Sequence, residues 1–208
     1  MKYYIDGILL GAICGVVAIL LAFGSPAPRG CRRLIRLMRC KVLRTRHILL
    51  ASAVGAIIGG YGSWLCEGSA PEYYGIMLLC TCLLSASVTD MRRHEIHLDV
   101  VALFALFGVA YLAIEYGLHG LLNGLIGAAA GAVMLGIPHL LRKDSVGIGD
   151  VALMALGGLY SGVPAVVYLL ARTLLLLALA SVIQLLRKKA TRKSEMPFAP
   201  FLMLGALI

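Results

Sequence analysis

The sequence predicts an all-α fold, a polytopic membrane helix bundle of about seven or eight hydrophobic segments. Hydrophobic residues make up 61% of the 208 residues and charged residues only 14%, whereas about a quarter of a typical soluble protein is charged. The mean hydropathy is +0.93. These values exclude a soluble globular domain. We expect helices, because a chain inside a bilayer must satisfy its own backbone polar groups and the apolar runs have helical length.

Eight apolar runs are candidates for these helices. Six approach the roughly 20 residues that a transmembrane helix needs, and they occupy residues 5–23, 47–65, 73–89, 97–116, 119–141 and 163–186. The runs 151–162 and 196–208 are shorter, so each is buried among other helices, thins the bilayer locally, or crosses with the help of flanking residues. We interpret the first run as an uncleaved span, because more membrane segments follow it.

Basic residues between the runs predict their orientation. The net charge of +9 would suggest nucleic acid as a partner of a soluble protein, but eight of the 19 Lys and Arg residues lie in the segment 24–46, which predicts a cytoplasmic loop. If eight helices alternate from there, 17 of the 19 lie in cytoplasmic connections and both termini lie outside. A seven-helix or re-entrant arrangement is the main alternative. We therefore expect a lipid bilayer and no nucleic acid as partner.

Two carboxylates lie at the ends of apolar runs. Asp90 closes the run 73–89, and Asp150 opens the run 151–162. The predicted topology places both at the cytoplasmic edge. Two carboxylates at the same depth can share a proton, so that one activates a water molecule as base and the other acts as acid. This is the chemistry of an aspartyl protease, in which the pair titrates as a unit.

Two glycines precede the second carboxylate. Gly147 and Gly149 lack a β-carbon, so an extended substrate backbone can approach them, and either can adopt the positive φ that would aim Asp150 into a site. The alternative is simpler: Gly-x-Gly is a common turn, and Asp150 is an N-cap or first-turn residue. Asp90, followed by two arginines, has its own alternative as an interfacial ion pair.

Three stretches in order carry a resemblance to a known family. The first is Thr89-Asp90 with Ile96 six residues after Asp90, the second is Gly147-Ile148-Gly149-Asp150 and its continuation to Gly157, and the third is Met196-Pro197-Phe198-Ala199-Pro200-Phe201-Leu202 and its continuation to Ala206. Together they resemble the type IV prepilin peptidases, membrane aspartyl proteases of the Gly-x-Gly-Asp type, over residues 80–208. The resemblance implies that Asp90 and Asp150 are the catalytic pair and that Gly147 and Gly149 shape the active-site turn.

The resemblance also implies a substrate and a location. Family members remove the short basic leader of prepilins or pseudopilins at the cytoplasmic face of the cell (inner) membrane, and they need no cofactor for proteolysis. We therefore expect a prepilin or pseudopilin precursor as partner. Residues 1–72 would hold the N-terminal spans with the basic loop 24–46, and residues 73–208 the peptidase core.

The chain departs from the family in its first loop and after Asp90. Many relatives have two Cys-x-x-Cys pairs, which bind zinc and accompany methylation of the new N-terminus from S-adenosylmethionine. This loop has only Cys31 and Cys40, and two thiolates do not close a tetrahedral site, so zinc is not expected. S-adenosylmethionine is expected only if methyltransferase activity is retained. His97 replaces a usual proline, so a rigid start of the fourth span is not assured.

Other acids and other functions are the remaining alternatives. Glu95, Asp99 and Asp144 could recognise the cations of a basic leader, or pair with neighbouring arginines and lysines. A small proton-coupled or ion-coupled transporter predicts acids nearer mid-membrane and an inverted repeat, neither of which is evident. A non-catalytic protein of pilus or secretion assembly would tolerate loss of both Asp90 and Asp150.

Overall fold

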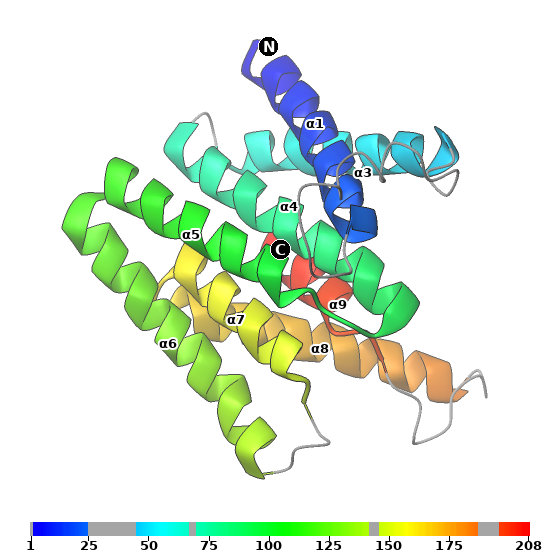
Figure 1. Cartoon of the computed structure of the whole chain (residues 1–208), viewed down its shortest axis with the longest axis vertical. Helices are drawn as coiled ribbons and strands as arrows, with labels where there is room; N and C mark the ends of the chain where they lie inside the picture. Colours follow the sequence, from blue (N-terminus) through cyan, green and yellow to red (C-terminus); the bar gives the residue numbers. More distant parts are fainter. Residues whose placement is uncertain (1, 25–44, 67–69, 142–145, 187–195) are drawn as a thin grey trace.

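The computed structural model describes residues 2–24, 45–66, 70–141, 146–186 and 196–208, and within them the regular structure is helical (Figure 1). The helices are α1 (Lys2–Gly24), α3 (Thr45–Leu65), α4 (Ala70–Arg93), α5 (Leu98–Glu115), α6 (Gly117–Leu141), α7 (Ile148–Ser161), α8 (Ala165–Leu186) and α9 (Ala199–Leu207). Each predicted apolar run is a helix. The all-α prediction is therefore confirmed.

Among the described residues, four helices, α4, α5, α6 and α8, are long and apolar enough to cross a membrane. In the most apolar stretch of each helix, 67% of α4 is buried inside the protein. The buried share is only 22% in α5, 22% in α6 and 17% in α8. Helix α4 is thus the centre of the bundle, and the other three present apolar side chains outward, as lipid-facing helices do. By length and composition the chain is a multi-pass membrane protein.

Buried hydroxyl groups let α4 occupy this central position. Thr81, Ser85, Ser87 and Thr89 are all buried. Each hydroxyl donates to a carbonyl oxygen three or four residues earlier in the helix, at 2.6 to 2.9 Å. Such bonds satisfy the polar groups without a partner on another helix. Small hydroxyl residues also let neighbouring helices approach closely.

Tight connections reverse the chain between successive helices. Only Tyr116 separates α5 from α6, and Gly117 after it has a φ of 62°. Gly162, between α7 and α8, has a φ of 68°, a left-handed conformation that favours glycine. The side-chain oxygen of Asn123 on α6 accepts the N–H of Val163 at 3.2 Å and holds this turn against α6. The short helix α7 therefore leads directly back into α8.

Glycines allow backbones to touch at two helix contacts. In the first, Gly11 and Gly15 of α1 lie against Gly55 and Gly59 of α3. In the second, a β-carbon at Gly131 of α6 would lie 2.5 Å from the carbonyl oxygen of Met154 on α7. Side chains at these positions would force the helices apart. Small residues thus let α6 and α7 approach closely at Gly131.

We expect Gly131→Ala to lower the stability of the protein and Gly136→Ala not to lower it. A β-carbon at Gly131 collides with backbone, whereas one at Gly136 meets only a Val151 methyl group at 3.9 Å. Overpacking should cost Gly131→Ala about 1–3 kcal/mol, and Gly136→Ala should be neutral or gain up to about 1 kcal/mol from helix propensity. Thermal unfolding of the purified variants in one detergent measures both. Equal shifts would show that α6 and α7 do not touch at Gly131.

Candidate active site

The carboxylates of interest lie at one end of the bundle. Asp90 is in the last turn of α4, and Asp150 is in the first turn of α7. The C-terminal end of α4 and the N-terminal ends of α5, α7 and α9 gather at this end (Figure 1). The two acids are close enough for the charge of Asp90 to act on Asp150. The fold thus brings together two residues that are 60 positions apart in the sequence.

Asp90 is buried at the start of α9. Only 6% of the residue is exposed, and its Oδ2 accepts the backbone N–H of Ala199 at 3.0 Å. Ala199 is the first residue of α9 and is fully buried, with Phe198 at the N-cap. The carboxylate therefore lies at the positive end of a helix dipole, where anionic groups are stabilised.

Asp150 is held mainly by its own turn. Its Oδ2 accepts the N–H of Gly147 at 3.3 Å, and its N–H donates to the Gly147 carbonyl oxygen at 3.1 Å. Its position in the first helical turn agrees with the simpler of the two interpretations made from sequence. This residue precedes the apolar run 151–162. Burial raises the pKa of Asp150 to about 6; the Gly147 bond opposes this rise, and the Asp90 carboxylate adds to it.

The two glycines before Asp150 differ in their role. Gly147 has φ −71° and ψ 148°, an ordinary extended conformation, and among the described glycines only Gly117 and Gly162 have positive φ. The expectation that Gly147 or Gly149 adopts positive φ is therefore wrong. Gly149 is instead required by close packing, because a β-carbon there would lie 2.6 Å from the Cβ of Ile96.

A four-residue segment, 94–97, connects α4 to α5 and packs against the turn that precedes Asp150. His94 has a φ of 51°, and its N–H donates to the Asp90 carbonyl oxygen at 2.9 Å, which ends α4. Ile96 packs against Gly149. His97 begins α5 with φ −79° and ψ 100°, values that a proline at this position would also adopt. The segment thus keeps the extended geometry without the proline.

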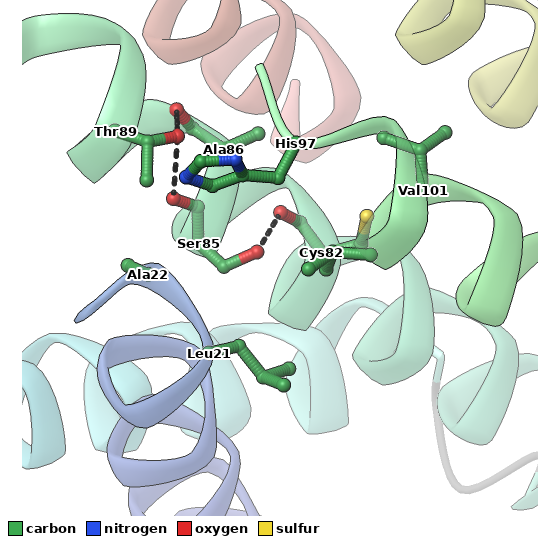
Figure 2. A pocket seen from close by; sticks show the side chains of 9 residues that line it. Leu21, Ala22, Cys82, Ser85, Ala86, Thr89, His97 and Val101 are labelled. Atoms are coloured by element: carbon green, nitrogen blue, oxygen red, sulfur yellow. Dashed lines mark hydrogen bonds between the residues drawn. The ribbon is translucent and has the colours of Figure 1, made fainter. Parts of the chain in front are cut away.

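A small cavity lies beside the same turn of α4. Figure 2 shows the His97 ring next to Ser85 and Thr89, with Leu21 and Ala22 of α1 on the facing side. The cavity measures about 10 Å³, which suffices for one water molecule and excludes a peptide. A peptide substrate therefore does not occupy this cavity, although its polar wall adjoins the site.

The remaining predicted residues are placed only in part. Glu95 lies in the segment 94–97 and Asp99 in the first turn of α5; both are exposed at the Asp90 end. Asp144 and most of the basic loop 24–46, with Cys31 and Cys40, lie outside the described residues. Within the part of the chain that the structure describes, no three His, Cys, Asp or Glu side chains form a metal-binding group.

The sequence did not reveal that α9 holds Asp90. The stretch 196–206 contributes to the family resemblance, but the sequence assigns it no chemical role. One signal was available: prolines at positions 197 and 200 mark the start of an apolar helix that has no polar capping side chain. The first N–H groups of such a helix need an acceptor from elsewhere. Which acceptor they meet depends on the tertiary fold.

Comparisons with known proteins agree on one family. Residues 77–186 match the type IV leader peptidase family. The prepilin leader peptidase/N-methyltransferase of Bacillus subtilis (strain 168) is 27% identical over 141 residues, or 68% of this chain and 56% of that protein. The prepilin leader peptidase/N-methyltransferase of Pseudomonas aeruginosa is 27% identical over 175 residues, or 81% of this chain and 59% of that protein. No solved structure matches the chain significantly.

The family match covers both carboxylates and ends before α9. The alignments span less than two thirds of the length of these relatives. The family region contains Asp90, the segment 94–97 and Asp150, and it comprises more than half of the sequence. The family expected from the three sequence stretches is confirmed, and the chain belongs to the type IV leader peptidase family.

Proposed function

We propose that this chain is a membrane-embedded aspartic endopeptidase that removes the short basic leader from type IV prepilin or pseudopilin-like precursors. The observation that carries the proposal is the approach of Asp90 and Asp150 at one end of the bundle, within the region that matches the family. The printed names of two relatives, prepilin leader peptidase/N-methyltransferase, support the same activity. We place the site at the cytoplasmic face of the inner membrane, because the basic loops predict that orientation.

The reaction needs one carboxylate and one carboxylic acid. The carboxylate takes a proton from a water molecule, whose oxygen attacks the carbonyl carbon of the scissile peptide bond. The carboxylic acid donates its proton to the carbonyl oxygen. When the tetrahedral intermediate collapses, the first carboxyl group returns a proton to the departing amine, and the second recovers a proton from the hydroxyl group. No metal or organic cofactor takes part in these steps.

The substrate is an apolar helix preceded by a short cationic segment. We propose that the helix docks laterally among the spans, so that the bilayer sets the depth of the scissile bond near Asp90 and Asp150. The exposed carboxylates of Glu95 and Asp99 lie at the same end. They attract the basic leader by charge complementarity. We propose the same role for Asp144, because the sequence places it before the Gly147–Asp150 turn.

We further propose that the chain has two parts. Residues 73–208 form the peptidase core, and residues 1–72 form an N-terminal pair of spans around the loop 24–46. We expect no zinc in that loop, since it offers only Cys31 and Cys40. S-adenosylmethionine would bind only if the chain also methylates its product.

Cleavage of a prepilin by the purified full chain tests this proposal. The protein in detergent should shorten the precursor by its leader, as mass spectrometry of the product would show, and the rate should be the same with and without a metal chelator. Inhibition by the chelator that zinc reverses would establish a metalloprotease instead. If a panel of prepilins and pseudopilins stays intact, the assembly and transporter functions become the better explanations.

A further inference from the structure

The two carboxylates have different hydrogen-bond partners. The Oδ2 atom of Asp90 accepts an N–H from α9, a helix that begins 109 residues later in the chain. Within the described structure, the hydrogen-bond donor to the Asp150 carboxylate is Gly147 of its own turn, at a longer distance of 3.3 Å. Hydrogen bonds to the charged form of an acid stabilise that form. The two sites therefore do not favour the proton equally.

The donor to Asp90 is one that α9 cannot use itself. The N–H groups of Phe201 and Leu202 donate to the Phe198 carbonyl oxygen at 3.1 Å. The residue after Ala199 is a proline, which has no N–H. The N–H groups of Ala199 and Phe198 remain, and both act on Asp90. That of Ala199, a fully buried residue, donates to the Asp90 Oδ2. Loss of this acceptor would leave a buried N–H unsatisfied.

Burial and neighbouring groups also act on both carboxyl groups. Burial is the largest influence on Asp90 and favours its protonated form, whereas the N–H groups of Ala199 and Phe198 and the His94 side chain favour the charged form. Helix α9, which packs on Asp90, has no titratable side chain. The acid facing Asp150 is Asp90, whose charge favours the protonated form of Asp150.

We propose that Asp90 is the ionised general base of the resting site, that Asp150 is the protonated general acid, and that the Ala199 N–H is the positioning group that fixes this order. The inference rests on the proposed peptidase function. Asp90 then takes the proton of the attacking water, and Asp150 gives its proton to the carbonyl oxygen. The collapse of the intermediate returns both protons and restores the starting order.

Infrared spectroscopy tests the order without any substrate. The wild-type protein should show the carbonyl stretch of a protonated carboxyl group at a pH of about 6. Asp150→Asn should lack this band. Asp90→Asn should keep it, but the band should disappear at a lower pH than in the wild type, because the charge of Asp90 is gone. A band that is lost in Asp90→Asn and kept in Asp150→Asn reverses the order and overturns the proposal. A band that both variants keep, or that both lose, overturns it as well.

Replacing one amide by an ester tests the role of α9. Nonsense suppression with lactic acid at position 199 replaces the backbone N–H with an ester oxygen and keeps the side chain. The acid limb of the pH profile of kcat/KM should rise by about one pH unit, because Asp90 loses a charge-assisted bond. The matched ester at Leu202 removes a bond within α9 and should leave that limb in place. Two results would show that the Ala199 N–H has only a structural role. In the first, the ester at 199 lowers kcat/KM at every pH without moving the acid limb; in the second, the esters at 199 and 202 move the limb equally.

The two readouts separate this inference from the proposed function. If the wild-type protein cleaves no prepilin but the infrared band follows the expected pattern, the function is wrong and the order of the carboxyl groups stands. If cleavage occurs and the band does not follow the pattern, the order is wrong and the function stands. Thermal unfolding of each variant ensures that both comparisons are made on folded protein.

Discussion

Asp90→Asn and Asp150→Asn should each lower kcat for prepilin cleavage by about 10²–10⁴-fold, the usual contribution of a general acid or base. An asparagine side chain still fills the space and can still accept the Ala199 N–H or the Gly147 N–H, so both variants should fold. It cannot take or give a proton at neutral pH. The measurement is single-turnover cleavage of one prepilin in detergent, with thermal unfolding recorded in parallel.

The double variant and a remote carboxylate make this test specific. Because the two groups act as one unit, the double variant should be little worse than either single variant. Asp6→Asn is the matched control, because Asp6 is an exposed carboxylate in α1. It is remote from the site: Ala22, near the other end of α1, faces the last turns of α4, and the 16 residues between Asp6 and Ala22 span about 24 Å of helix. If either active-site variant kept the wild-type rate, that residue would have no role in proton transfer.

The helices were predictable because one physical constraint dominates them. A backbone inside a bilayer must bond to itself, so every long apolar run had to be a helix, and the short runs 151–162 and 196–208 followed the same rule as α7 and α9. The end of the bundle that holds Asp90 was also predictable. The positive-inside rule and the alternation of spans predict that Asp90 and Asp150 lie at the same end.

The contacts within the site could not be derived in this way. The bond between Asp90 and Ala199 joins residues 109 positions apart, and no local pattern specifies such a pair. The error at Gly147 has a similar origin. A glycine in a turn suggests positive φ, but the requirement that acts here is the packing of Ile96 on Gly149. Periodicity and charge report the environment of a residue, whereas its partner is set by how the helices pack.

Gly149→Ala should be far more damaging than Gly147→Ala. A β-carbon at Gly149 would lie 2.6 Å from the Cβ of Ile96, an atom fixed to the backbone, whereas one at Gly147 would lie 3.4 Å from the Asp150 Oδ2. Relieving the first collision must move the residue next to Asp150, and a displacement of about 1 Å can cost about 10²-fold in rate. We expect that loss in kcat/KM for Gly149→Ala, and a loss below about tenfold for Gly147→Ala.

Ile96→Gly in the Gly149→Ala background shows which contact matters. It removes the colliding Cβ, so the double variant should recover part of the rate and of the thermal stability that Gly149→Ala loses, whereas the same change in a Gly147→Ala background should recover neither. If both alanine variants were equally impaired and Ile96→Gly rescued neither, the glycines would serve the approach of the substrate backbone. In that case the Gly-x-Gly turn would be a binding surface, and its packing on Ile96 would be incidental to catalysis.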